Sequence, residues 1–346
     1  MASNDIGIDL GTTTVIIAQE GKGTVLNQPS IVAVDTRKKG SRDYVLAVGD
    51  DALAMVGRTP NYISAIFPLK DGVISDHTMT QELICRFVDK VYAKRLAKPR
   101  VAVCVPAAIT RVECDAVVEA VMAAGARKVY LIDEPLAAAL GSGLDILAPE
   151  GRMIIDIGGG TTDIAVLSLG GKVKSASVPV AGNTFDDEIL KYIRTRFNMA
   201  IGQRTAENLK KQVACCSQRA DFQQTMEVKG MSLVSNLPRR LTVSTSDLYE
   251  PVMMLCERIG AAAHQVLEQT PPELAGDIFR NGVMLTGGGA LLHGLPEYLE
   301  ETLKVKVVVS PDPVNCVAMG TAKSLSMDEL LETGFEDATP GIGKFH

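Results

Sequence analysis

Two stretches of sequence decide the fold: "IGIDLGTTTVII" at residues 6–17 and "IIDIGGGTTDIAV" at residues 154–166. Each reads as an apolar strand, one aspartate, a glycine turn, a run of threonines and a second apolar strand. The two aspartates, Asp9 and Asp156, lie 147 residues apart in a chain of 346 residues. Because a domain of about 150 residues is ordinary in size, the repeat predicts two similar lobes.

Composition limits the function classes. The chain is 46% hydrophobic and 22% charged, which is typical of a globular protein. A net charge of −6 and a pI of about 5.4 argue against a basic surface for nucleic acid, so no nucleic-acid partner is expected. Seven cysteines without spaced pairs indicate a reducing compartment rather than a disulfide framework. The adjacent Cys215 and Cys216 lack companions at zinc-site spacing.

The N-terminus carries no secretory signal pattern, and no apolar run approaches the ~18 residues that span a bilayer. We therefore expect a cytoplasmic protein.

Strand and helix patterns alternate along the chain. An apolar run at 99–107 predicts a central strand covered on both faces. Thr110 and Glu113 form a capping-box pattern, and Gly125 ends the helix that they begin. A strand at 127–133 leads into an Ala-rich helix that closes at Gly141. In the second half, helices are expected at 185–197, 205–216 and 247–269, and strands of a small unit within 217–244. The class is α/β.

The repeated turns suit a magnesium–phosphate group. Phosphate oxygens need inward-pointing backbone N–H groups, which glycines allow, and threonine hydroxyls add neutral donors. Hydrated Mg²⁺ keeps most of its waters and takes few protein ligands, which are usually carboxylates. "DLGTTT" (9–14) and "DIGGGTTD" (156–163) each supply that set, and one turn from each lobe would grip the phosphate chain. A third turn, "LTGGGALLHG" (285–294), precedes a helix and suits close approach to a nucleoside. One such turn alone is ordinary hairpin chemistry, whereas three together predict nucleotide binding.

These three turns, in this order, resemble the phosphate and adenosine motifs of the actin/Hsp70/sugar-kinase superfamily. Within it the chain resembles the MreB family of bacterial actin homologues, including its close paralogues. The resemblance runs from about Ile6 to Leu325 and is carried by stretches 21–34, 57–76, 98–113, 124–144, 201–210 and 267–295. It implies an actin-like ATPase fold of two lobes, each with a central mixed sheet flanked by helices, plus small inserted subdomains. Lobe I is expected at 1–143, with an insertion at about 33–75 and completion by 321–346. Lobe II is expected at 144–320, with an insertion at about 183–243.

The resemblance also implies roles for individual residues, with ATP or ADP and Mg²⁺ as cofactors. Asp9 and Asp156 would hold Mg²⁺ through water, and Glu134 would orient the attacking water with Thr161 close by. The residues implied to bind nucleotide are Gly11, Thr12, Thr13, Thr14, Gly158, Gly159, Gly160, Thr161, Thr162, Glu207, Asn208, Lys210, Gly287, Gly288, Gly289 and Ala290.

Glu134 has a second interpretation. It follows an apolar strand and precedes a helix, so its carboxylate could project into a cleft and position a water. The alternative is that Glu134 only caps the Ala-rich helix. The family match favours the catalytic role.

Three residues depart from the family pattern. Thr13-Thr14 stands where Ala-Asn is common, Asp163 replaces a glutamate, and Phe67 replaces a basic residue. None of these changes removes a carboxylate assigned above.

Function is not settled by the fold, since kinases, chaperones and filament proteins share it. A small-molecule kinase is the alternative, but the larger insertion and the aspartate base that it would normally carry are not evident. An Hsp70-type chaperone needs a peptide-binding domain, and only 26 residues follow Gly320. The resemblance therefore implies a slow ATP hydrolase that polymerises, in paired protofilaments, and helps scaffold cell-wall synthesis to maintain rod shape. Its expected partners are further copies of itself and membrane-embedded cell-shape and wall-synthesis proteins.

Two loops, 57–67 and 267–277, are candidates for the longitudinal surface of such a polymer; buried packing is the alternative for both. The family acts at the inner face of the membrane. A loop around Leu96, with Lys94, Arg95, Lys98 and Arg100, predicts weak membrane binding that would add along a filament. A solvated basic loop is the alternative.

Overall fold

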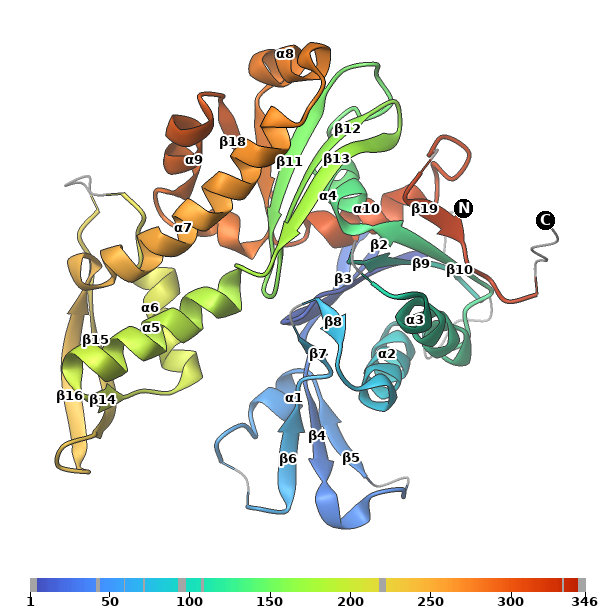
Figure 1. The fold of residues 1–346 in the computed structure, drawn as a ribbon. Coiled ribbons are helices and arrows are strands. Elements are labelled where there is room, and N and C mark those ends of the chain that lie inside the picture. The colour runs from blue at the N-terminus through green and yellow to red at the C-terminus, as the bar shows by residue number, and fades with distance from the viewer. Residues whose placement is uncertain are drawn as a thin grey trace. The chain divides into compact units, whose positions relative to one another are not determined.

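The computed structural model describes residues 5–41, 44–58, 60–70, 72–92, 98–106, 109–217, 222–331 and 333–341. The chain divides into two compact units (Figure 1). Unit 1 comprises Met1–Pro149, Leu167–Lys172 and Asn315–His346, and unit 2 comprises Glu150–Val166 and Val173–Val314. The lobe boundaries expected from the sequence stay predictions.

Unit 1 is built on a six-stranded mixed sheet with the order β19-β10-β9-β1-β2-β3. Its strands are β1 (Ile6–Leu10), β2 (Thr14–Gln19), β3 (Gly23–Pro29), β9 (Arg100–Val105), β10 (Lys128–Asp133) and β19 (Phe335–Asp337). Strands β1, β9 and β10 run parallel to one another, and the outer pairings are antiparallel. The parallel strands therefore end at one edge, where ligands of α/β proteins usually bind.

Helices cover both faces of this sheet. One face packs its alternate residues, such as Ile8 and Val103, with Phe87 of α2 (His77–Tyr92) and Val117 of α3 (Arg111–Ala123). The other face is covered by α10 (Cys316–Ser324), which packs with α4 (Glu134–Gly141). Burial on both sides explains the nearly continuous apolar run of β9. The predicted capping box is confirmed: the Glu113 amide donates to Thr110 Oγ1, and the Thr110 amide donates to Glu113.

The contact between α4 and α10 leaves no room for side chains. A Cβ added to Gly141 would overlap the carbonyl oxygen of Cys316, and one added to Gly320 would overlap that of Ala137. A Cβ on Gly7 of β1 would overlap the backbone of Ala322 in α10. Helix α10 therefore meets β1 on one side and α4 on another, each backbone against backbone, which only glycine permits.

Unit 1 also holds two small sheets. The first has the order β5-β4-β6, and the second pairs β7 with β8. Their strands are β4 (Val32–Asp35), β5 (Val45–Val48), β6 (Ile63–Ile66), β7 (Leu69–Lys70) and β8 (Val73–Ile74), accompanied by η1 (Thr36–Lys38) and α1 (Asp50–Leu53).

Unit 2 contains a five-stranded sheet with the order β13-β12-β11-β17-β18. Its strands are β11 (Arg152–Ile157), β12 (Thr162–Ser168), β13 (Gly171–Val178), β17 (Val283–Thr286) and β18 (Val307–Val309). The helices are α5 (Gly182–Phe197), α6 (Gln203–Gln212), α7 (Thr245–Glu268), α8 (Pro272–Asn281) and α9 (Leu295–Leu303), with a 3₁₀ turn η2 (Gly288–Leu291).

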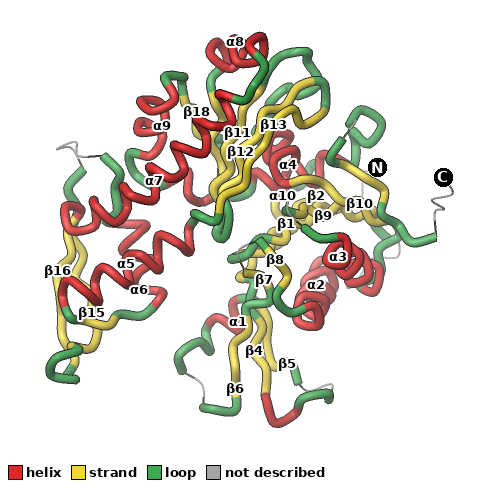
Figure 2. Tube along the Cα trace, in the orientation of Figure 1, coloured by secondary structure: helices red, strands yellow, loops and turns green. Residues whose placement is uncertain are grey.

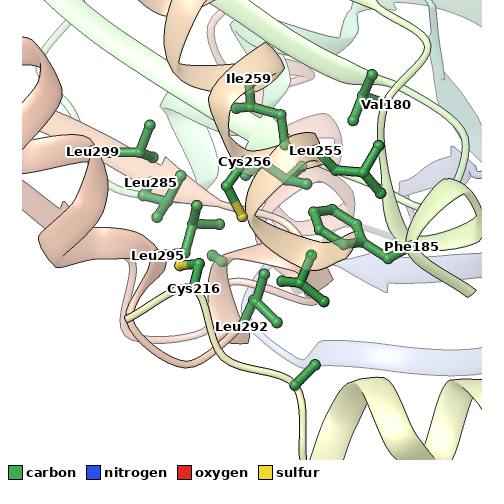
Figure 3. Packing of buried hydrophobic residues seen from close by; sticks show 14 of the residues in the cluster. Val180, Phe185, Cys216, Leu255, Cys256, Ile259, Leu285, Leu292, Leu295 and Leu299 are labelled. Carbon is green, nitrogen blue, oxygen red and sulfur yellow. The ribbon is translucent and has the colours of Figure 1, made fainter. Parts of the chain in front are cut away.

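The core of unit 2 joins this sheet to its helices (Figure 3). Leu255, Cys256 and Ile259 of α7 pack with Leu285 of β17 and Leu295 of α9. Cys216 lies in the same core, as a small apolar side chain does. The backbone of the strands that carry the second and third glycine turns is thus held from one side by a continuous apolar cluster.

Helix α6 is shorter than the sequence predicts. It ends at Gln212, whereas the pattern predicted helix to residue 216. After Gln212 the chain pairs with the segment that leads into α9, and the Cys216 amide donates to the His293 carbonyl at 3.0 Å. This hydrogen bond to a distant segment takes the place of the one that the Cys216 amide would make in a helix.

A three-stranded sheet, β14-β15-β16, forms a separate part of unit 2 (Figure 2). Its strands are β14 (Met199–Ala200), β15 (Thr225–Ser232) and β16 (Pro238–Ser244). The strands predicted within 217–244 are therefore confirmed, and β15 and β16 pair antiparallel as a hairpin.

Candidate functional site

In unit 1, the first acidic turn joins β1 to β2. Leu10 pairs with Val15, so Gly11 to Thr14 form the connection. A Cβ on Gly11 would lie 2.7 Å from the Thr14 carbonyl oxygen, which explains the glycine. Thr12 accepts a hydrogen bond from the Gly72 amide at 3.0 Å, while its hydroxyl hydrogen can still be donated. Thr13 is exposed.

Asp9 lies near the carboxyl end of β1 and is partly buried. Burial raises its pKa from 3.8 to about 7, because desolvation disfavours the charged form. Asp9 pairs with Cys104 of β9, which in turn pairs with Ile132 of β10. Glu134 follows two residues after Ile132, so both carboxylates belong to the same edge of the sheet.

Glu134 is the first residue of α4, and Asp133 occupies the N-cap position. The Lys172 ammonium donates to the Asp133 carboxylate at 2.6 Å, and the backbone amide of Asp133 donates to the Gly334 carbonyl. Asp133 makes no side-chain cap hydrogen bond, and Glu134, as an acidic side chain in the first turn, favours the helix dipole. The two roles predicted for Glu134, catalysis and helix stabilisation, both stay predictions. Glu134 as a whole residue is partly exposed.

In unit 2, the second acidic turn follows β11. The Gly158 amide donates to the Thr161 carbonyl at 3.0 Å, which closes the turn. The first amides of α5 bind back to it: Gly182 donates to the Gly158 carbonyl at 3.0 Å, and Asn183 donates to that of Gly159 at 2.8 Å. The positive end of a 16-residue helix thus adjoins this turn, an arrangement that favours anions.

Thr162 differs from Thr161, the other threonine of the second turn. Its side chain is fully buried, and its hydroxyl donates to the Val180 carbonyl at 2.6 Å. The hydrogen of this hydroxyl therefore already has an acceptor within unit 2. Asp163, where the family commonly has glutamate, is also buried.

Lys210 of α6 lies at the second turn. Its ammonium donates to the Gly182 carbonyl at 2.8 Å and to Asp186 at 2.9 Å. Sequence reasoning missed Gly182 and Asp186, although "AGNTFDD" at 181–187 offered a glycine before a helix with acids one turn later. Glu207 pairs instead with Lys211 at 2.6 Å, and Asn208 lies beside it, partly buried.

The third turn lies directly beside Asp156. Asp156 pairs with Thr286 across parallel strands β11 and β17. Gly287 has φ +81°, and a Cβ there would lie 2.5 Å from Asp156 Oδ1. Gly289 packs against Ile157, whereas a Cβ on Gly288 would meet only open space. Gly288 therefore leaves accessible backbone next to a buried carboxylate, and Ala290 is buried behind it.

The residues fit a magnesium nucleotide by their chemistry. Among the described residues, no group of three or more His, Cys, Asp or Glu side chains could hold a metal directly. In unit 2, Asp156 lies beside the accessible backbone of Gly288, a setting that suits an ion held through its own waters. In unit 1, Asp9 lies beside the turn at 11–14. In unit 2, the N-terminus of α5 adjoins the turn at 158–161, which suits phosphate.

We expect the stability of unit 2 to fall as the pH rises from about 4 to about 6. Burial raises the pKa of Asp186 from 3.8 to about 6, more than nearby Lys210 lowers it. The folded chain therefore binds more protons than the unfolded chain in this window, and ionisation at higher pH costs on the order of 1–3 kcal/mol. Urea unfolding at pH 4.5, 5.5 and 6.5 measures the slope. Asp186→Asn should reduce the slope and leave the part that comes from Asp9, whose pKa is raised over the same pH range. An unchanged slope would assign all of it to groups other than Asp186.

The predicted site residues form two groups. Unit 1 brings together Asp9, the turn at 11–14 and Glu134. Unit 2 brings together Asp156, the turn at 158–161, Lys210 and the turn at 287–290, and Glu207 lies on the same helix as Lys210.

The chain matches the family model of the MreB/Mbl protein over residues 3–333. It is 49% identical to the cell shape-determining protein Mbl of Bacillus subtilis over 332 residues, covering 95% of this chain and 98% of Mbl. It is 44% identical to the cell shape-determining protein MreB of Escherichia coli, covering 95% of each chain.

Solved structures agree with these relatives. The fold matches MreB5 of Spiroplasma citri bound to ADP with a TM-score of 0.86 and 37% identity, covering 94% of this chain and 97% of that one. It also matches a MamK double helical filament with a TM-score of 0.75, at 21% identity, covering 93% and 99%. The expected actin-like fold is confirmed, and the chain belongs to the MreB/Mbl protein family.

Proposed function

We propose that this protein is an ATP-binding, ATP-hydrolysing cytoskeletal protein that polymerises and helps to determine cell shape. The observation that carries the proposal is the acidic glycine turn present in each unit, with Asp9 in one and Asp156 in the other. Support also comes from relatives. Mbl and MreB are described as cell shape-determining, MreB5 binds ADP and AMPPNP, and MamK forms a double helical filament.

Each residue group has a distinct task in this proposal. Asp9 and Asp156 hold the waters of Mg²⁺, and the turns at 11–14 and 158–161 donate backbone hydrogen bonds to phosphate. Lys210 and Glu207 lie on the nucleoside side, and the turn at 287–290 borders the adenine and ribose. When bound, Mg²⁺ neutralises charge that develops on the phosphate oxygens. Glu134, with Thr161, positions the attacking water.

The cellular setting is also proposed from the relatives. Filaments of this protein would lie at the inner face of the membrane and guide wall synthesis through membrane-embedded partners. In the described part of the chain, no helix has the length and apolarity needed to cross a bilayer. In the loop predicted to bind membrane, Leu96, Lys94 and Arg95 lie outside the described residues. Lys98 is exposed, whereas Arg100 begins β9 and forms an ion pair with Asp5 at 2.8 Å. Membrane binding by this loop stays a prediction.

Electron microscopy of the purified protein tests the proposal. With ATP and Mg²⁺ we expect filaments, accompanied by slow phosphate release. Dispersed protein that transfers phosphate to a small molecule would instead support a kinase of the same fold.

Replacing Asp156 should weaken nucleotide binding only when magnesium is present. Asp156→Asn keeps the shape of a side chain that is 2% exposed but removes its charge. Loss of a group that orients metal-bound waters typically costs 10–100-fold in metal affinity, so we expect that loss for ATP with Mg²⁺. Calorimetry with ATP and Mg²⁺, and with ATP and EDTA, measures both affinities. An equal loss under both conditions would argue that Asp156 serves the fold of the turn rather than the metal.

A further inference from the structure

Asp133, the residue that precedes Glu134, is held by several other segments of unit 1. It ends β10, and its backbone pairs with β9. Its amide donates to the Gly334 carbonyl at 2.8 Å, and its carboxylate accepts from the Lys172 ammonium at 2.6 Å. Lys172 belongs to the segment Leu167–Lys172, which joins β12 to β13 and is part of unit 1. The backbone at the start of α4 is therefore fixed by contacts from outside the helix.

The Asp133 carboxylate does not serve its own helix. An aspartate at an N-cap usually accepts a hydrogen bond from an amide in the first turn of the helix. Asp133 has the extended backbone of an N-cap residue, yet its side chain makes no such bond. Pro135, in the first turn of α4, has no amide hydrogen to offer. The carboxylate is bonded to Lys172 instead, so the ion pair has a role that the local helix does not explain.

The residues just before β19 support both members of this ion pair. Gly334 has φ +77°, where glycine is favoured, and a Cβ there would lie 3.1 Å from Asp133 Oδ2. Thr333 Oγ1 accepts from the Lys172 amide at 3.4 Å. A Cβ on Gly171 would lie 2.9 Å from the same threonine oxygen. The two glycines therefore allow this segment to pack closely against the pair.

Strand β19 anchors the segment along β10 (Figure 1). Phe335 pairs with Ile132 and stacks on Tyr130, with 5.2 Å between the ring centroids. The Ala338 amide donates to the Val129 carbonyl at 2.9 Å. The support behind the ion pair is therefore built into the six-stranded sheet of unit 1.

We propose that the Lys172–Asp133 ion pair, supported by Gly334, positions Glu134 for ATP hydrolysis. Lys172 and Asp133 are positioning residues, because they act by fixing the backbone from which the Glu134 carboxylate reaches the attacking water. This inference rests on the proposed function and adds the residues that set the geometry of its catalytic carboxylate. A misplacement of about 1 Å in such a group can cost about 10²-fold in rate. The loss is expected in hydrolysis and not in ATP affinity, since Glu134 is proposed to contact the water rather than the nucleotide.

The chain offers a matched control for this ion pair. Lys128 and Asp337 form another pair on β10, at 3.0 Å, and Lys128 lies five residues before Asp133. The side chains of this pair are 36% and 29% exposed, against 30% and 27% for Lys172 and Asp133. The two pairs are therefore alike in chemistry and exposure, and they differ in their distance along β10 from Glu134.

Removal of each lysine tests the proposal. Lys172→Ala should lower the single-turnover rate of ATP hydrolysis about 10–100-fold, while the ATP affinity measured by calorimetry stays unchanged. Lys128→Ala should match wild type in both quantities. Lys172→Arg keeps the charge and most of the reach, so it should recover most of the rate. Equal losses in Lys172→Ala and Lys128→Ala would show a general effect on the sheet and overturn the proposal.

Double variants test whether Lys172 acts through Glu134. In a Glu134→Ala chain the carboxylate is already absent, so addition of Lys172→Ala should slow hydrolysis no further. A further loss as large as the one in wild type would mean that Lys172 acts independently of Glu134, and the proposal would be wrong. Asp133→Asn should be as slow as Lys172→Ala, and the chain with both changes should be no slower than either alone.

The remaining outcomes are also separable. Wild-type protein that does not hydrolyse ATP would defeat the proposed function itself. A Lys172→Ala chain with the wild-type rate, when Glu134→Ala is slow, would defeat this inference alone. Pelleting with AMPPNP and Mg²⁺ measures assembly without hydrolysis, and Lys172→Ala should need the same protein concentration as wild type. If it needed a higher concentration, the ion pair would serve assembly and the inference would be wrong.

Discussion

Gly320→Ala is expected to destabilise unit 1 by more than about 4 kcal/mol, which is exceptional for a single added methyl group. The added Cβ would overlap the carbonyl oxygen of Ala137, and the nearest atoms also include the amide nitrogen of Gly141. These are backbone atoms of a helix, so no side-chain rotation relieves the overlap, and α4 and α10 have to separate. Separation would also disturb α4 at Glu134, the proposed catalytic residue.

Urea unfolding followed by circular dichroism measures this effect; the chain has no Trp for fluorescence. Gly276→Ala is the control, since it adds the same methyl group to a helix where nothing lies within 4 Å. It should leave stability unchanged or raise it by up to about 1 kcal/mol. A Gly320→Ala protein within 1 kcal/mol of wild type would mean that the two helices move apart at little cost.

Glu134→Ala should lower the rate of ATP hydrolysis by about 10²–10⁴-fold while ATP affinity changes little. Loss of a residue that positions and partly deprotonates a water has an effect of this size. The alternative role, an acidic residue in the first turn of α4, is worth only about 0.3–1 kcal/mol of stability and predicts no change in hydrolysis. Filaments should therefore form and persist with ATP, because the bound nucleotide is not consumed.

Phosphate release under single-turnover conditions, together with calorimetric ATP titration, separates hydrolysis from binding. Glu134→Gln keeps the shape and should be nearly as slow as Glu134→Ala, since the carboxylate charge is what accepts the proton. Glu119→Ala, at an exposed acid of α3 in the same unit, should hydrolyse ATP at the wild-type rate. If Glu134→Ala retained full hydrolysis, another residue would position the water.

Local patterns predicted much of the fold and part of the site. The capping box of Thr110 and Glu113, the end of that helix near Gly125 and the start of α4 all depend on residues within one or two turns. The two acidic turns were likewise predictable, because a strand, an acid and a glycine turn are neighbours in the chain.

For Thr162, the family resemblance and the strand pattern point in different directions. The resemblance implies phosphate binding, whereas the hydroxyl donates to the Val180 carbonyl inside unit 2. Side chains alternate along a strand, and Ile164 and Val166 of β12 face the core. Thr162 shares their parity, so the strand period predicts an inward side chain.

The sequence by itself determined the α/β class, the acidic turns that carry Asp9 and Asp156, and membership of a family, because these depend on residue type and short spacing. Only the tertiary structure decided the joining of Lys210 to Asp186, 24 residues apart, and the meeting of Gly141 with Gly320. It also decided that Phe279 of α8 and Val234, between β15 and β16, stay exposed while Ile278 is buried. The physical reason is that turn and cap energies act between neighbours, whereas close approach and exposure depend on how distant segments pack.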